Sequence, residues 1–145
     1  MSNKIVPTIS SGTAGPLGVL HLPRLWQKMS LGAAGKLAEG YGNCSPGYDM
    51  MVLDALGVDR DALVAFVSQK KPTYIEFEKY FAENATMLNQ TAVSQLNNAI
   101  LGYQHTDETR QGILAAAGLP DGKPTDAISL NNLDDWQEFH AAEIA

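Results

Sequence analysis

Two cations near the start of the chain have no acid close to them in the sequence. Arg24 and Lys28 are four residues apart and therefore share one face of a helix, and no Asp or Glu occurs before Glu39. A guanidinium binds a carboxylate or phosphate through paired hydrogen bonds, and an ammonium adds a point charge. The pair predicts a binding site for an anionic organic molecule. The alternative is that acids of the second half neutralise both cations across a helix–helix or subunit contact.

A glycine-rich turn over residues 40–49 follows, and it contains most of the reactive side chains. Small residues let backbone approach a ligand, and the N–H groups that open the next helix attract negative charge. Tyr41 and Asp49, together with His21, are our candidates for proton transfer. Tyr48 and Cys44 are candidate substrate contacts, because a thiol just before a helix has a lowered pKa. The alternatives are a buried, inert Cys44 and an Asp49 that complements the helix dipole.

The three histidines do not have the spacing of a metal site. His21, His105 and His140 are far apart, and no His-x-x-x-His, Glu-x-x-His or His-x-Glu pattern occurs. A general-base role for His21 or His105 is chemically possible. The sequence also lacks a dinucleotide fingerprint, a phosphate-binding loop and a nucleophile elbow. We therefore expect no metal and no cofactor.

Helical signals recur along the chain after an N-terminal segment rich in Ser, Thr, Gly and Pro. An apolar stripe begins at Leu22 and extends to Leu37, and Thr73 with Glu76 has the pattern of a capping box. No period-2 strand is found. We predict an all-α fold, a compact bundle of six or seven short helices. Residues 1–20 would form an extended arm and 21–145 a single helical domain. The expected helices span about 22–39, 45–56, 59–71, 73–84, 91–103, 106–117 and 132–139.

Composition limits the classes of function. The chain has 145 residues and a net charge of −6, which argues against a nucleic-acid partner. The charge is uneven, with seven Lys/Arg and five Asp/Glu over 1–72, then three and eleven over 73–145. No apolar run reaches the roughly 18–20 residues that a membrane span requires. One cysteine and no leader signal indicate a cytoplasmic protein.

Several short motifs between residues 20 and 70 resemble the bacterial domain-of-unknown-function family numbered 5069. The resemblance lies in Leu22-Pro23-Arg24, Gly35-Lys36-Leu37, Tyr41, Cys44, Asp49 and Leu56-Gly57-Val58-Asp59. In that family a Cys-Pro pair precedes the Asp, whereas Ser45 separates Cys44 from Pro46 here. The resemblance implies a small helical protein of the bacterial cytoplasm and assigns no reaction to it.

Two functions remain open. The first is a cofactor-independent small-molecule enzyme, or a ligand-binding domain, for an anionic organic compound. Its chemistry would be acid–base, of the lyase, isomerase or dehydratase type. The second is a non-catalytic helical interaction module that associates with another protein or with a second copy of itself. Convergence of His21, Arg24, Tyr41 and Asp49 on one pocket would favour the first function.

Overall fold

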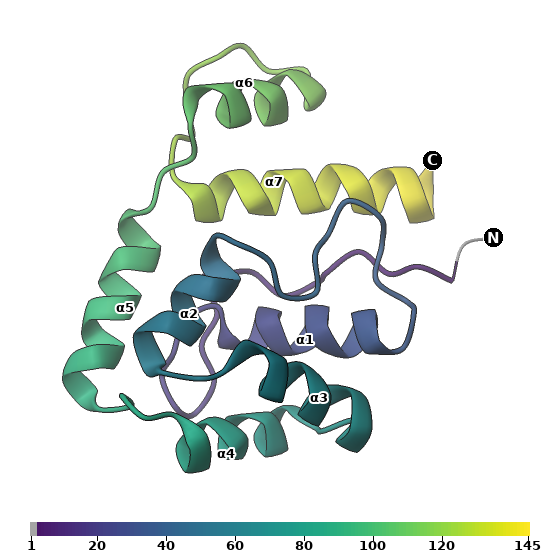
Figure 1. Ribbon diagram of the computed structural model, residues 1–145. Coiled ribbons are helices and arrows are strands. Elements are labelled where there is room, and N and C mark those ends of the chain that lie inside the picture. Colours follow the sequence, from purple (N-terminus) through teal and green to yellow (C-terminus); the bar gives the residue numbers. More distant parts are fainter. Residues whose placement is uncertain (1–2) are drawn as a thin grey trace.

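The computed structural model describes residues 3–145, and α-helices form nearly all of its regular structure (Figure 1). In this part of the chain only isolated β-bridges occur, and no strand. The all-α prediction is therefore confirmed. The elements are α1 (Leu22–Ala33), α2 (Tyr48–Leu56), α3 (Arg60–Lys70), α4 (Tyr74–Asn84), α5 (Gln90–Gly102), α6 (Asp107–Ala116), α7 (Ala127–Phe139) and a π-helical turn η1 (His140–Ile144).

Local capping explains where several helices begin. The Asp59 carboxylate accepts a hydrogen bond from the Ala62 N–H at 2.9 Å and opens α3. At α4, the Thr73 hydroxyl accepts from the Glu76 N–H, and the Glu76 carboxylate accepts from the Thr73 N–H. The capping box is therefore confirmed, and the two bonds satisfy donors that a helix start leaves free.

Three predicted boundaries are wrong, each for a local reason. The first helix ends at Ala33 because Gly35 turns left-handed, with φ +70°, and Leu37 pairs with the N-terminal segment instead. The second begins only at Tyr48, since the Ser45 N–H donates to the Asp49 side chain rather than Ser45 capping the helix. The last begins at Ala127, five residues early, because Asp126 caps it by accepting from the Ser129 N–H.

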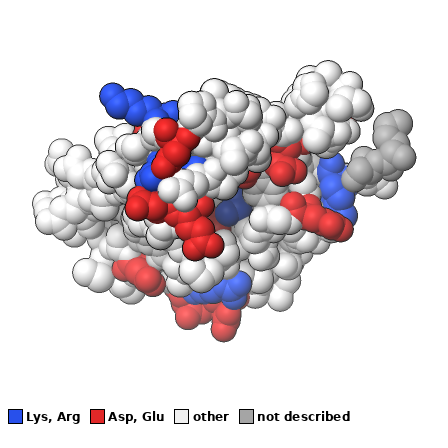
Figure 2. All heavy atoms as spheres, turned by 90° about the horizontal axis from the view of Figure 1, so that it is seen from above, with Lys and Arg blue, Asp and Glu red and all other residues white. Residues whose placement is uncertain are grey.

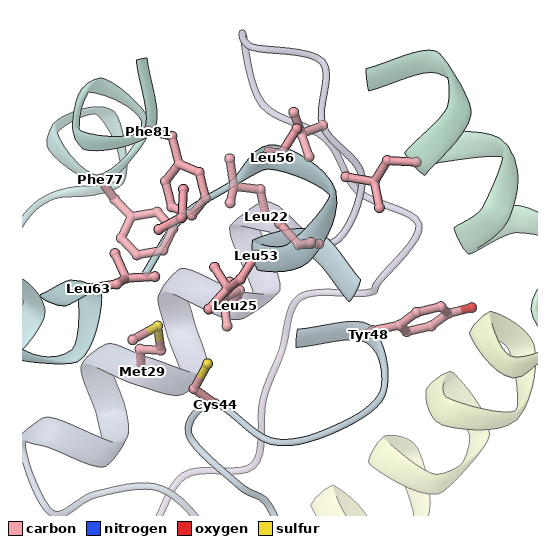
Figure 3. Close-up of a cluster of buried hydrophobic side chains, with 14 of the residues drawn as sticks. Leu22, Leu25, Met29, Cys44, Tyr48, Leu53, Leu56, Leu63, Phe77 and Phe81 are labelled. Atoms are coloured by element: carbon pink, nitrogen blue, oxygen red, sulfur yellow. The ribbon is translucent and has the colours of Figure 1, made fainter. Parts of the chain in front are cut away.

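The hydrophobic core lies among the first five helices. Helix α1 packs against α3 and α4, and α2 packs against α5. Figure 3 shows most of these buried side chains gathered around one another, with the Tyr48 ring directed away from the others. Fully burying one such side chain contributes about 1.5–3 kcal/mol. The residues labelled there are Leu22, Leu25, Met29, Cys44, Tyr48, Leu53, Leu56, Leu63, Phe77 and Phe81.

Residues 3–20 contain no helix and run across the helical domain. Val19 is fully buried in the core. The segment is fastened to α5, where the Asn97 side chain accepts from the Leu20 N–H and donates to the Gly18 carbonyl, at 3.0 and 2.8 Å. A third bond joins the Leu17 N–H to Glu78 of α4. The N-terminal segment is therefore held against α4 and α5 over its second half.

Helices α6 and α7 pack on each other and form a second layer (Figure 1). The connection of residues 34–47 and the N-terminal segment lie between α7 and α1 in this view. A backbone bond from the Ala127 N–H to the Tyr103 carbonyl ties the start of α7 to the end of α5. The boundary between the layers holds the candidate site. None of the helices within residues 3–145 has the length and apolar character to cross a membrane.

Candidate functional site

A cleft of about 250 Å³ lies between the start of α1, the 40–46 loop and α7. It receives side chains from both layers and from the connection between α5 and α6. Figure 2 views the molecule from the side of α6 and α7 and shows acidic and basic side chains intermingled rather than segregated. The residues that line the cleft are His21, Arg24, Lys28, Gly40, Tyr41, Gly42, Ser45, Pro46, Tyr48, Asp49, Tyr103, His105, Asn131, Asp134 and Asp135.

The Asp49 carboxylate is the centre of one buried network at this cleft. Its Oδ1 bonds His21 Nε2 at 2.6 Å, and its Oδ2 accepts from Lys28 Nζ at 2.7 Å. The same Oδ2 accepts from the Ser45 N–H at 3.0 Å, so both oxygens are occupied. His21 and Asp49 are each 2% exposed. His21 reaches Asp49 because it precedes α1 in a left-handed conformation, with φ 71°.

Burial and charge set the ionisation of this pair in a definite direction. Burial opposes ionisation of Asp49, but the His21 hydrogen bond and the Lys28 charge outweigh it and lower the pKa to about 2. For His21, burial lowers the pKa below its ordinary 6.5, despite the hydrogen bond and charge of Asp49. His21 is therefore a neutral imidazole at pH 7. Since ionised Asp49 can only accept, Nε2 carries the proton.

Ser11 completes a Ser–His–Asp chain that the sequence did not reveal. Its hydroxyl lies 2.9 Å from His21 Nδ1 and donates to that nitrogen in the neutral tautomer. In serine hydrolases the imidazole is the other way round, with Nδ1 toward the carboxylate and Nε2 toward the nucleophile. Ser11 is also 1% exposed and does not line the cleft. The chain is thus a structural network rather than a hydrolase triad.

A second network joins α1 to α7 through Asp135. Arg24 donates to both carboxylate oxygens, at 2.6 and 3.1 Å, and also to the Ile9 carbonyl at 2.9 Å. The Tyr41 hydroxyl donates to the same carboxylate at 3.0 Å. Burial and then the Asp135 charge raise the pKa of Tyr41 far above 10, so its phenol stays protonated. Both cations of the predicted anion site are thereby paired, Arg24 by an acid of the second half and Lys28 by Asp49.

Several of the cleft's polar side chains keep groups that no other side chain or backbone group among residues 3–145 uses. Asp134 has no hydrogen bond or ion pair among residues 3–145, and burial, with the charges of Glu138 and Asp135, raises its pKa. His105 bonds Asn131 Oδ1 through Nε2, at 2.8 Å, which leaves Nδ1. The Tyr103 hydroxyl has no hydrogen bond within the described chain either. Lys28 Nζ keeps two N–H groups beyond the bond to Asp49. These groups are what the cleft offers to a ligand.

Two predicted contact residues are used by the core. Cys44 is buried between α1 and α2, outside the cleft lining, and Figure 3 shows it close to Met29. Burial is the largest influence on its thiol and raises the pKa. Cys44 is therefore the buried, inert side chain that the sequence offered as the alternative to a substrate contact. Tyr48 lines the cleft with its ring 5.3 Å from that of His21, but its hydroxyl donates to the Ile100 carbonyl of α5. Burial raises the pKa of Tyr48 to about 12.

No model of a known protein family matches the chain, and no curated protein is significantly similar to it. The resemblance to the family numbered 5069 stays a prediction.

Within residues 3–145, no three His, Cys, Asp or Glu side chains are grouped as metal ligands would be. Two of the carboxylates at the cleft are instead paired with cations, Asp49 with Lys28 and Asp135 with Arg24.

The predicted catalytic residues His21, Tyr41 and Asp49 do meet at one cleft, with Arg24, Lys28 and Tyr48. Sequence reasoning did not select Tyr103, Asn131 or Asp134 as site residues, although His105 was a candidate base. Asn131 and Asp134 lie three residues apart on α7 and share a face. That spacing was the available signal, but nothing in the sequence showed that this face turns toward α1.

Proposed function

We propose that the cleft binds a small polar organic molecule and that Asp134 holds it by accepting a hydrogen bond from an ammonium or hydroxyl group. The observation that supports this is the contrast between Asp134 and its neighbours. Asp49 and Asp135 are fully engaged by cations, whereas Asp134 has no bonded partner among residues 3–145. A partly buried carboxylate without a partner is unfavourable, and a donor from a ligand relieves this.

The fixed charges favour a ligand with a donor group over a simple anion. The lining contains two cations, Arg24 and Lys28, and three carboxylates. A carboxylate or phosphate that used the NH1 and NH2 edge of Arg24 would have to displace Asp135 from hydrogen bonds of 2.6 and 3.1 Å. The N–H groups left for an acceptor are two on Lys28 Nζ and those of the Arg24 guanidinium that Asp135 and Ile9 do not use. A compact amine, amino alcohol or amino acid therefore fits the cleft better than the purely anionic compound that the sequence predicts.

Acid–base chemistry at this cleft would rest on Asp134 and His105. A raised pKa brings the Asp134 carboxyl closer to the range in which a group both gives and takes a proton. His105 has one ring nitrogen, Nδ1, that no bond within the described chain uses, so it can accept a hydrogen bond from a ligand. His21 and Asp49 instead hold α1, α2 and the 40–46 loop in place. We include in the proposal that the activity is of the lyase, isomerase or dehydratase type. We also include that the protein is a bacterial cytoplasmic one related to the family numbered 5069.

A thermal-shift screen tests the proposal. Small amines, amino alcohols and amino acids are compared with carboxylates, phosphates and sugars at 10 mM. Binding to the folded state stabilises it by about 2.7 kcal/mol at a hundredfold excess over Kd. We expect donor compounds to raise the Tm of the wild type and not of Asp134→Asn. Shifts by carboxylates or phosphates alone would support the anionic ligand instead, and no shift by any compound would contradict a binding function.

Exposed aromatic side chains on α7 favour a second candidate, the interaction module. Trp136 is 65% exposed and Phe139 43%. Together with Pro7 and Asp135 they line a groove of about 240 Å³. Large exposed apolar groups are typical of protein contact sites. Sedimentation velocity of the wild type and of Trp136→Ala tests self-association. A concentration-dependent dimer that the substitution dissolves would favour this function, and a monomer at 100 μM would contradict self-association.

A further inference from the structure

A row of four aromatic rings in mutual contact lines the cleft. The centroids of successive rings lie 5.3, 5.3 and 6.1 Å apart. The residues come from the start of α1, from α2 and from the connection between α5 and α6. They are, in order, His21, Tyr48, Tyr103 and His105. The cleft therefore combines this aromatic row with its charged side chains.

Tyr103 is the open member of the aromatic row. It is 39% exposed, whereas Tyr48 is only 8% exposed. The planes of the Tyr48 and His105 rings are inclined to that of Tyr103 by 56° and 90°, so neither ring stacks flat on it. Within residues 3–145, the Arg24 guanidinium carbon lies 6.0 Å from the centroid of Tyr41, but no cation lies over Tyr103. The Tyr103 ring is therefore available to a ligand.

The unpaired carboxylate of Asp134 lies beside the end of the aromatic row. His105 Nε2 bonds Asn131 Oδ1 at 2.8 Å, and Asp134 is one helical turn further along the same face of α7. Burial is the largest influence on the pKa of Asp134 and raises it, whereas the charges of Arg24 and His105 act in the opposite direction because both are near. The open ring and the unpaired carboxylate thus belong to one part of the cleft.

The fixed charges of the lining leave an excess of one negative charge. The lining contains three carboxylates and two cations, which are Asp49, Asp134 and Asp135 against Arg24 and Lys28. A singly charged cation brings the sum to zero, whereas a zwitterion leaves it negative and an anion makes it more so. An unbalanced charge is costly in a partly buried site. The cleft therefore favours a cationic ligand over an amino acid.

An aromatic ring beside a carboxylate is suited to a methylated ammonium group. The positive charge of such a group is spread over apolar methyl groups, which pack against the negative face of a ring. An ammonium with only N–H groups is compact and strongly hydrated, and it would leave the apolar surface of Tyr103 uncovered. Methylation therefore matches both the charge and the open ring.

We propose that the cleft selects a compact amino alcohol with an N-methylated ammonium group. The methyl groups lie against the Tyr103 ring, and the ligand hydroxyl donates to Asp134, whose charge balances that of the cation. The cleft volume of about 250 Å³ limits the ligand to a compact molecule. This inference rests on the function proposed above, because it uses the same cleft and the same carboxylate, and it narrows the ligand to one chemical class.

Isothermal titration calorimetry with four compounds tests the selectivity. Ethanolamine, N,N-dimethylethanolamine and choline share a hydroxyl and a positive charge and differ in methylation. The fourth compound is the neutral alcohol in which a tert-butyl group replaces the trimethylammonium group of choline. Since each buried methyl group strengthens binding about threefold, we expect the Kd of choline to be about tenfold below that of ethanolamine. The neutral analogue should bind about tenfold more weakly than choline, because it lacks the charge that Asp134 balances.

Variants at two positions assign the contacts, and an unchanged Tm shows that each is folded. Tyr103→Leu keeps an apolar side chain without the ring and should weaken choline about fivefold, with ethanolamine nearly unaffected. Tyr103→Phe is the matched control, since it keeps the ring and the Tyr103 hydroxyl has no hydrogen bond within the described chain. It should bind choline as the wild type does. Asp134→Asn should weaken choline and ethanolamine alike.

Three results would overturn the inference and leave the proposed function standing, provided that binding still depends on Asp134. They are equal Kd values for choline and ethanolamine, equal Kd values for choline and its neutral analogue, and choline binding that Tyr103→Leu does not change. Binding of none of the four compounds would also overturn the inference. The proposed function would fail with it only if the amines, amino alcohols and amino acids of the thermal-shift screen gave no shift either.

Discussion

Arg24 at the start of α1 and Asp135 in α7 form a doubly hydrogen-bonded ion pair across 111 residues of sequence. The side chains are only 7% and 9% exposed. This pair joins the two helical layers directly beside the cleft. It also neutralises the cation that made an anion site attractive from the sequence. The positive first half and the acidic second half thus meet within one chain.

Breaking this pair should strongly destabilise the protein. Asp135→Asn leaves Arg24 charged and buried with a poorer acceptor, and removing one partner of a buried ion pair costs about 3–5 kcal/mol. The measurement is urea denaturation at pH 7. Asp134→Asn is the matched control on the neighbouring residue, and it should cause no loss because the folded state already disfavours that charge. An equal decrease in the free energy of unfolding of the two variants would contradict a stabilising role for the Arg24–Asp135 pair.

A left-handed glycine at the end of α2 is expected to resist substitution. Gly57 has φ +70°, and a β-carbon there would collide with the Thr86 hydroxyl. The Thr86 backbone N–H and hydroxyl both donate to the Gly57 carbonyl, so Thr86 is held in place. Gly57→Ala should therefore lower the free energy of unfolding by about 2–4 kcal/mol, from the left-handed backbone and the steric clash together. Gly118, with φ +75°, has open space around it, so Gly118→Ala should cost only the backbone term of about 1–2 kcal/mol. Denaturation midpoints check both, and similar losses would show that the Thr86 contact is unimportant.

Stability should fall on mild acidification because of His21. Its pKa is lowered in the folded state, so below about pH 6.5 the unfolded chain binds a proton that the folded protein does not. The free energy of unfolding should decrease by up to about 1.4 kcal/mol per pH unit there. The His21→Asn variant should lose this slope, and the exposed control His140→Asn should keep it.

A second decrease belongs to Asp49. Its folded pKa of about 2 lies below the ordinary 3.8, so its contribution is present above about pH 4 and is lost as the pH falls toward 2. Denaturation curves at pH intervals from 2 to 8 separate the two regions. A flat profile from pH 7 to 5 would contradict a buried neutral His21.

Ser11 should matter for stability and not for chemistry. Ser11→Ala removes the hydrogen bond to His21 Nδ1, and losing a buried bond of this kind typically costs about 1 kcal/mol. A fluorophosphonate probe that labels activated serines should not react with the wild type, because the hydroxyl is buried. Labelling that Ser11→Ala abolishes would mean that the Ser–His–Asp chain is catalytic after all.

Local rules predicted the helical class and several helix starts, since caps such as Asp59 and Thr73 depend only on neighbouring residues. The predicted helix boundaries were wrong where a side chain makes a tertiary contact instead of a local one. Ser45 precedes a proline as a helix cap would, but its N–H donates to the Asp49 carboxylate. Leu37 continues the apolar stripe of the first helix, but its backbone pairs with the N-terminal segment. Periodicity cannot separate these outcomes, because it contains no information about distant partners.

The part of the cleft near the first helix was predictable from the sequence, and the part that α7 provides was not. His21, Arg24, Tyr41 and Asp49 were selected as one cluster near the first helix, and they line one cavity. The side of the cleft that α7 provides depends on how the two layers pack, which pairs Arg24 with Asp135 rather than with any nearer acid. Ser11 gave no signal, because a serine in a polar segment is indistinguishable from a loop residue.

In the proposed function, a ligand occupies the cleft and is held by Asp134. The most direct measurement is an amide-resolved NMR titration with the amine, amino alcohol or amino acid that gives the largest thermal shift. We predict saturable changes at Gly40, Gly42 and Asn131, which line the cleft from both sides, and their loss in Asp134→Asn. Changes confined to other surfaces, or the same titration curve in Asp134→Asn, would contradict it.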